Sequence, residues 1–199
     1  MRLRVAQVVE DTEAEGPGKR FALWVQGCSL RCPGCCNPEM FGAEGGVEAD
    51  SAELAARALK VAGLDGVSVL GGEPCEQAEA VADFCERVRA GGLGVMLYSG
   101  YRLEELRALR SPAVERLLAT TDLLVDGRYE RERPEHARRW LGSSNQQLHF
   151  LTSRYRKDDP RFATPNTVEL RLSKDGLTVN GWPGGARGLE GLRAFKRRG

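Results

Sequence analysis

The sequence of 199 residues has no long hydrophobic run, few aromatic residues and almost no net charge. No stretch approaches the roughly 20 apolar residues that a membrane-spanning helix needs, so we expect no membrane segment. The N-terminal residues reach the acidic pair Glu10-Asp11 without an unbroken apolar run, which argues against a secretory signal and predicts a cytoplasmic protein. The formal net charge of +1 predicts no general affinity for nucleic acid, because such binding needs a concentrated basic surface.

The six cysteines are distributed unevenly along the chain. Without an export signal we expect no disulfide framework, because the cytosol keeps thiols reduced. Clustered thiols in such a chain point to a metal site instead. Four of the six lie within nine residues, at positions 28, 32, 35 and 36, whereas Cys75 and Cys85 stand apart. The cluster is therefore the main candidate site.

Strands and helices are expected to alternate through the middle of the chain. We predict strands over 20–26, 66–70, 94–98 and 122–125, and helices over 51–62, 76–90 and 103–119. Asp50 or Ser51 is the predicted cap of the first helix. The alternation predicts βαβ units and an α/β fold with mostly parallel strands. A closed eightfold barrel needs about 250 residues, so we expect a partial (β/α) barrel.

From residue 147 the pattern changes to short strand-like pieces, at 147–151, 167–172 and 177–180. The last two flank Asp175-Gly176, a pair that favours a tight hairpin turn. We therefore predict a catalytic domain over 1–153 and a small C-terminal β extension over 154–199. The basic end Lys196-Arg197-Arg198 and the Gly-rich segment 181–191 are predicted to be a flexible, solvated tail. The extension is expected either to cover an open sheet edge or to dock a partner.

The strongest motif runs from Cys28 to Cys35, with the spacing C-x3-C-x2-C, and follows a predicted strand. Three thiolates leave one iron of a four-iron cubane open to another ligand. A structural zinc site would need a fourth donor. Cys36 is poorly placed as a fourth ligand because it adjoins Cys35, and Cys75 would have to approach the loop in space. A zinc site or a cluster closed by a fourth cysteine stays open as the alternative. A buried, unliganded state is expected for Cys85 and favoured for Cys36 and Cys75.

A second motif, Gly71-Gly72-Glu73-Pro74, follows the predicted strand 66–70. Two glycines let a backbone approach a ligand closely, and Glu73 offers an acceptor for an ammonium group. Taken alone, a glycine pair after a strand is more typical of a simple turn. Because the cysteine loop follows another strand of the same predicted sheet, both segments should meet at one edge, where α/β sites usually lie.

In order and spacing these motifs resemble the radical S-adenosylmethionine (SAM) superfamily, and within it the anaerobic ribonucleotide reductase activating proteins. The resembling segments are Gly16-Pro17-Gly18, Gly27 to Asn37, Gly71 to Pro74, Ser99-Gly100-Tyr101, Leu124 to Gly127 and Gly142 to Gln146. They extend over residues 16 to about 150, which is most of the chain. Leu141 stands where the family usually carries arginine, and Cys36 stands where an aromatic residue is common. Both departures concern the identity of the substrate and not the cluster.

The resemblance implies a set of site residues. The implied ligands of a [4Fe-4S] cluster are Cys28, Cys32 and Cys35, and the implied SAM contacts are Gly71, Gly72, Glu73, Ser99, Asp126 and Asn145. The glycine motif would hold the SAM amino group, and Ser99 and Asp126 would contact its ribose or carboxylate. Helix capping or turn formation is an equal alternative for those two. A plain loop is the alternative for the segment around Asn145.

The resemblance also implies an activity, namely reductive cleavage of SAM to a 5'-deoxyadenosyl radical. That radical would take a hydrogen atom from a glycine of a partner, anaerobic ribonucleoside-triphosphate reductase, with an electron donor such as flavodoxin. Two alternatives stay open. One is a radical SAM enzyme acting on a small molecule or peptide, which the C-terminal strands and Leu141 favour. The other is a non-enzymatic Fe-S or zinc-binding module.

Overall fold

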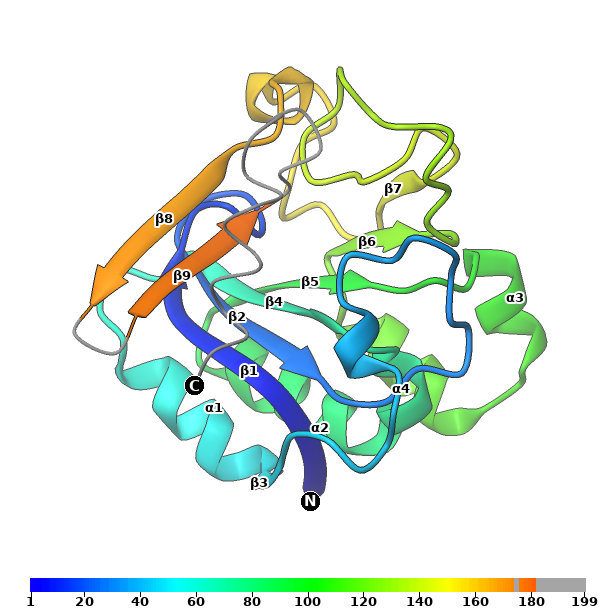
Figure 1. Ribbon diagram of the computed structural model, residues 1–199. Coiled ribbons are helices and arrows are strands. Elements are labelled where there is room, and N and C mark those ends of the chain that lie inside the picture. Colours follow the sequence, from blue (N-terminus) through cyan, green and yellow to red (C-terminus); the bar gives the residue numbers. More distant parts are fainter. Residues whose placement is uncertain (174–175, 182–199) are drawn as a thin grey trace.

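The computed structural model describes residues 1–173 and 176–181, and its core is a seven-stranded sheet. The strands are β1 (Arg2–Thr12), β2 (Arg20–Val25), β3 (Val47–Asp50), β4 (Gly66–Gly71), β5 (Gly94–Tyr98), β6 (Leu123–Asp126) and β7 (Gln147–Phe150). Their order in the sheet is β3-β1-β2-β4-β5-β6-β7. The four central strands are parallel, and β1, β3 and β7 add to the two sides in antiparallel pairings. The predicted α/β class is confirmed, and the sheet stays open (Figure 1).

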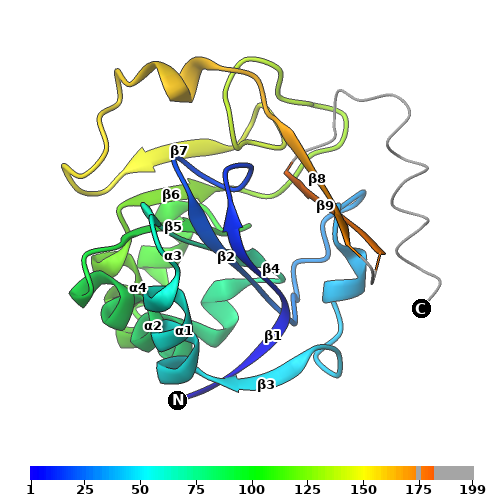
Figure 2. The same ribbon diagram turned by 90° about the vertical axis from the view of Figure 1, so that its left-hand side faces the viewer.

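Helices cover one face of this sheet (Figure 2). They are α1 (Ser51–Lys60), α2 (Ala78–Ala90), α3 (Leu103–Ala108) and α4 (Pro112–Thr120). All six residues of β2 are buried, because the strand alternates between two apolar layers. Phe21, Leu23 and Val25 pack in the helix layer, whereas Ala22 and Trp24 pack on the opposite face. A large cavity, described below, lies on that opposite face.

Loops and a small hairpin cover the second face (Figure 2). The hairpin consists of β8 (Val168–Ser173) and β9 (Gly176–Gly181), paired antiparallel. Phe162, in the segment before it, packs edge-on against Trp140 and Phe150, with ring centroids 5.3 and 5.0 Å apart. Residues after position 153 therefore complete the core on this face, while the domain boundary at 153 stays a prediction.

Two strands near the N-terminus, β1 and β3, were not predicted. The pairing of β1 with β2 shifts register twice, between Val5 and Gln7 and between Val9 and Thr12. These bulges break the alternation of apolar and polar residues by which a strand is recognised. β3 is only four residues long and has no buried residue, so its alternation of apolar and polar residues is too short to identify a strand.

The helix predicted over 103–119 is wrong in one respect, because the chain forms two helices there. Arg110 has a left-handed backbone (φ 48°), which ends α3. Ser111 then caps α4 by accepting from the backbone N–H of Val114, with Pro112 at the first helical position. The cap predicted for α1 is confirmed at Asp50. Its carboxylate accepts from the backbone N–H groups of Ala52 and Glu53, at 2.9 and 3.2 Å.

The predicted hairpin strands are confirmed, and they pair from Val168 to Gly181. The turn residues Lys174 and Asp175 and the predicted tail over 182–199 lie outside the described residues. Among the helices of residues 1–173 and 176–181, none combines the length and apolar character needed to cross a bilayer.

Candidate functional site

The carboxyl ends of the parallel strands meet at one edge of the sheet, as predicted. The backbone N–H of Gly72, after β4, donates to the carbonyl of Val25 at 2.7 Å. The N–H of Glu73 donates to the carbonyl of Gly27, at the start of the cysteine loop, at 2.8 Å. The N–H of Gly100, after β5, donates to the Glu73 carboxylate at 2.8 Å. Hydrogen bonds thus join the cysteine loop, the glycine motif and the end of β5.

The glycine pair is required by crowding from the protein's own backbone. A Cβ on Gly72 would lie 2.1 Å from the Gly27 carbonyl oxygen. Gly71 has φ +108°, and a Cβ there would lie 2.7 Å from the backbone nitrogen of Val25. Both distances are far below a van der Waals contact, so only glycine lets β4 approach the end of β2 this closely. Both glycines also line the cavity described next.

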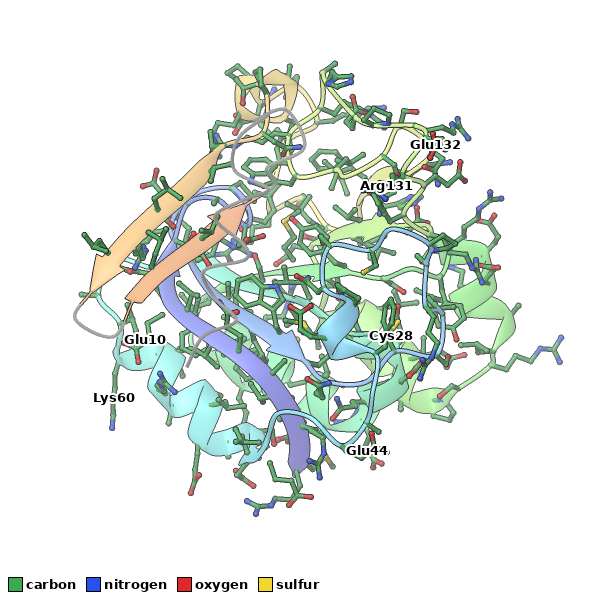
Figure 3. All side chains as sticks on the ribbon, in the orientation of Figure 1. Glu10, Cys28, Glu44, Lys60, Arg131 and Glu132 are labelled. Carbon is green, nitrogen blue, oxygen red and sulfur yellow. The ribbon has the colours of Figure 1, made fainter. Side chains whose placement is uncertain are left out.

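The cysteine loop encloses one side of a large cavity of about 1410 Å³. Four thiols line it, those of Cys28, Cys32, Cys35 and Cys36, and each of these residues is partly buried. Figure 3 labels Cys28, which lies in the loop that follows β2. Burial raises the pKa of the Cys28 and Cys32 thiols, so these groups are protonated at neutral pH until a metal replaces the proton.

The loop is held by the side chain of Gln26, which sequence reasoning missed. Its amide nitrogen donates to the carbonyl oxygens of Glu39 and Gly42, at 3.1 and 2.6 Å. The N–H of Cys28 donates to the carbonyl of Phe41 at 3.1 Å. The two ends of the loop are therefore closed on each other beside the thiols. A polar residue at the end of an otherwise apolar strand was the available signal.

The two cysteines outside the loop differ in burial. All six cysteines lie in the described part of the chain, and their thiols form no disulfide. Cys85 is fully buried inside α2, as predicted. Cys75 is partly buried, with its sulfur 3.8 Å from the Ser99 hydroxyl, and it does not line the cavity.

Three cysteine thiols are the kind of donor set that an iron–sulfur cluster takes from a protein. Within the described residues, no three Cys, His, Asp or Glu side chains converge on one point that an ion would occupy. In a cubane each thiolate binds a different iron, so three sulfurs need not converge. The three cysteines of the C-x3-C-x2-C motif line one cavity from one short loop, and this arrangement suits such a group.

Glu73 is a buried carboxylate, 1% exposed, that joins two strand ends. It accepts hydrogen bonds from the N–H of Cys75 at 2.9 Å, the hydroxyl of Ser99 at 3.0 Å and the N–H of Gly100 at 2.8 Å. Burial raises its pKa, against the effect of these donors. Glu73 and Ser99 both line the cavity, and the hydrogen bond between them fixes the position of the serine hydroxyl.

Asp126 and Asn145 are not among the residues that line the cavity. The Asp126 carboxylate accepts from the N–H of Leu103, at the start of α3, at 2.6 Å, and lies 2.8 Å from His149 Nε2. The side-chain amide of Asn145 donates to the Arg128 carbonyl at 2.8 Å. The geometry of Asp126 matches the helix-capping alternative, and that of Asn145 matches the plain-loop alternative. Contact of either residue with a cofactor stays a prediction.

Comparison with known proteins agrees with this geometry. Residues 14–149 match the family model described as a 4Fe-4S single cluster domain. The anaerobic ribonucleoside-triphosphate reductase-activating protein of Escherichia coli K12 is 31% identical over 147 residues, covering 68% of this chain and 91% of the relative. The chain belongs to this activating-protein family. The protein of the same name from Enterobacteria phage T4 is 29% identical over 150 residues, covering 72% of this chain and 92% of the relative.

A second kind of activating protein is also similar. The pyruvate formate-lyase-activating enzyme of Listeria monocytogenes is 31% identical over 129 residues, covering 61% of this chain and 51% of the enzyme. The family model ends at residue 149, so the hairpin β8–β9 lies outside the matched region of this activating-family member. Four hairpin residues nevertheless line the same cavity as the thiols, namely Arg171, Leu177, Val179 and Gly181.

Proposed function

We propose that this protein is a radical SAM activase that generates a glycyl radical on an anaerobic ribonucleoside-triphosphate reductase. The observation that carries the proposal is a cavity lined by four thiols and the glycine motif, at the carboxyl ends of parallel strands. Relatives named as activating proteins of that reductase and of pyruvate formate-lyase support the same activity. The alternatives of a small-molecule enzyme and of a non-enzymatic metal module are not favoured by these relatives.

In this proposal Cys28, Cys32 and Cys35 hold a [4Fe-4S] cluster, and the fold is a partial radical SAM barrel. When bound, the cluster and SAM supply reductive cleavage of the sulfonium to a 5'-deoxyadenosyl radical. Three thiolate ligands would leave one iron of the cluster open to a further ligand, and in this proposal that ligand is SAM. The reductant is a small electron carrier such as flavodoxin.

The protein's own residues would orient SAM and keep water away from the reacting carbon. Gly71, Gly72 and Glu73 would bind the methionyl amino group of SAM. The Ser99 hydroxyl, which donates to the Glu73 carboxylate at 3.0 Å, would form a hydrogen bond with the ribose or carboxylate of SAM. Trp24 and Leu70, both buried on the cavity face of the sheet, make an apolar floor. Such a floor limits water that would otherwise consume a reactive radical.

The test is anaerobic reconstitution followed by three measurements: iron and sulfide content, 5'-deoxyadenosine release with dithionite, and the electron paramagnetic resonance signal of a glycyl radical on the cognate reductase. Replacement of Cys28, Cys32 or Cys35 by serine should abolish all three. Cys36→Ala, which removes a thiol from the same cavity, is the matched control and should keep the cluster. A wild-type protein that binds four irons but never yields 5'-deoxyadenosine would contradict the proposal.

A further inference from the structure

The carboxylate of Glu76 holds the start of the cysteine loop. Its oxygen Oε1 accepts from the backbone N–H of Ser29 at 2.9 Å and from the Ser29 hydroxyl at 2.5 Å. Ser29 directly follows Cys28, the first cysteine of the C-x3-C-x2-C motif. Hydrogen bonds to a charged acceptor are among the stronger ones in proteins. A negative charge is therefore fixed next to the residue proposed as the first cluster ligand.

The turn that carries Glu76 is anchored to the sheet. Glu76 belongs to the 3-10 helix η2 (Pro74–Gln77), which starts at the end of the glycine motif. The side-chain amide of Gln77 donates to the carbonyls of Gln26 and Arg4, at 2.9 and 3.1 Å. The Gln77 side-chain oxygen accepts from the N–H of Arg4 at 2.7 Å. Because these contacts reach β1 and the end of β2, the Glu76 carboxylate meets the loop from a fixed position.

Two carboxylates act on the thiol of Cys28. Burial is the main reason why the pKa of this thiol is raised, and the charges of Glu73 and Glu76 raise it further. The backbone N–H groups of Arg31 and Leu30 act in the opposite direction. In the part of the chain that the structure describes, no cation forms an ion pair with Glu76, which is exposed. Its negative charge therefore stays uncompensated beside Cys28.

The second cysteine of the motif lies in a different electrostatic setting. Burial also raises the pKa of the Cys32 thiol, but the backbone N–H of Tyr129 and the guanidinium of Arg128 lower it. That guanidinium lies 2.9 Å from the Glu105 carboxylate, which compensates part of its charge. The loop thus has a negative side at Cys28 and a weakly positive side at Cys32.

A fixed negative charge beside an iron–sulfur cluster opposes reduction of that cluster. Reduction takes one electron from dithionite or from a small electron carrier and adds one negative charge, which a nearby carboxylate repels. The reduction potential of such a cluster follows the net charge and the hydrogen bonds around it. A carboxylate beside Cys28 therefore lowers the potential, and the electron, once it has entered, passes more favourably to an acceptor such as the sulfonium of SAM.

We propose that Glu76 is a positioning residue that lowers the reduction potential of the cluster by fixing its negative charge beside Cys28. This inference rests on the proposed function and deepens it, because it names the side chain that makes the bound cluster a stronger reductant. The two hydrogen bonds from Ser29 keep the carboxylate in place, and the anchored turn η2 prevents it from moving away.

The first test is a redox titration of the full-length reconstituted protein without SAM, followed by electron paramagnetic resonance. Glu76→Gln keeps an acceptor for Ser29 and removes the charge, so the equilibrium constant for reduction should rise about tenfold, an upward shift of about 59 mV. Glu76→Asp keeps a charge and should stay within about threefold of wild type. In about 1 M salt the difference between Glu76→Gln and wild type should shrink, because salt screens an exposed charge.

Glu79→Gln is the matched control, because it removes another exposed carboxylate, at the start of α2. It should leave the potential unchanged. A wild-type potential in Glu76→Gln, or an equal shift in Glu79→Gln, would overturn the inference. A protein that takes up iron but never releases 5'-deoxyadenosine would refute the proposed function and leave the measured role of Glu76 in place, whereas a protein that takes up no iron would refute both.

A second test examines the contact itself and needs no cluster. Hydrogen exchange of the Ser29 amide is followed by NMR in the full-length, iron-free protein. Glu76→Ala removes the acceptor, so this amide should exchange about tenfold faster than in wild type. Glu76→Gln should exchange at close to the wild-type rate, because its side-chain oxygen still accepts. Equal exchange of the Ser29 amide in wild type and Glu76→Ala would overturn the inference, since the charge would then not be fixed beside Cys28.

Discussion

Gly72 is the residue on which the edge of the cavity depends most directly. A methyl group there would lie 2.1 Å from the Gly27 carbonyl oxygen, so Gly72→Ala must push the cysteine loop away from β4. We expect a loss of about 3 kcal/mol in the free energy of unfolding and failure to retain iron. Urea unfolding and iron analysis measure the two effects. Gly42→Ala, whose new methyl would meet only the end of the Glu44 side chain, is the control, and equal loss in both variants would contradict the prediction.

Asp122 is a buried carboxylate that connects β5, α2 and the chain after β7. It accepts from Arg89 at 2.8 Å, from the N–H of Val95 at 2.9 Å and from the Thr152 hydroxyl at 2.5 Å. Asp122→Asn turns one acceptor into a donor and leaves the Arg89 charge without its partner. We expect a loss of about 2–4 kcal/mol at pH 7, measured by urea unfolding. Asp158→Asn, at an exposed ion pair, should change nothing measurable.

The same carboxylate predicts a dependence of stability on pH. Burial alone would raise the pKa of Asp122, but hydrogen bonds from Thr152, Val95 and Arg89 more than offset burial, and the pKa is lowered from 3.8. Its contribution is therefore present above the unfolded-state pKa and is lost as pH falls through the lower folded-state value. The stability difference between wild type and Asp122→Asn should shrink below about pH 4. A difference that grows on acidification would contradict this.

At the scale of elements, one side chain ahead of β8 joins the segment before the hairpin to the loop around Trp140. The Asn166 amide accepts from the N–H of Trp140 and donates to the Leu141 carbonyl at 2.8 Å. Asn166→Ala leaves both backbone groups without these partners, so we expect local opening of the hairpin to become easier by about 1–3 kcal/mol. Hydrogen exchange of the β8 and β9 amides measures this.

Asn166→Asp keeps the acceptor and loses the donor, so its exchange should lie between wild type and Asn166→Ala. Protection in the central strand β4 should be the same in all three proteins, because its pairing with β2 and β5 does not involve this contact. Uniform loss of protection across the sheet would mean that Asn166 supports the whole fold and not the hairpin alone.

At the scale of the whole molecule, an iron–sulfur cluster that binds only to the folded chain should stabilise the folded state. Reconstitution with iron and sulfide should raise the midpoint of thermal unfolding, by an amount corresponding to about 3 kcal/mol or more when binding is tight. Cys28→Ser should lack this increase, whereas Cys36→Ala should keep it. Calorimetry under anaerobic conditions measures the difference. Equal midpoints with and without iron would contradict a cluster bound by this loop.

Much of the central sheet was predictable because its strands are buried on both faces. β4 and β5 lie within a residue of the predicted strands 66–70 and 94–98, since a short, continuous apolar run has few other stable placements. β1 was missed because its bulges break the alternation of side chains. The break between α3 and α4 was missed although Ser111-Pro112 is a recognisable helix start.

The order and spacing of the cysteine and glycine motifs by themselves determined the family and the edge of the sheet at which the site lies, because parallel strands place their carboxyl ends together. Only the tertiary structure decided which polar residues reach the cavity. Ser99 lines it, whereas Asp126 accepts from the start of α3, and spacing along the chain does not distinguish these outcomes. Only the tertiary structure, too, brought the hairpin beside the thiols, because contacts between residues about 160 positions apart, such as Arg171 and Asp11, leave no periodic pattern in the sequence.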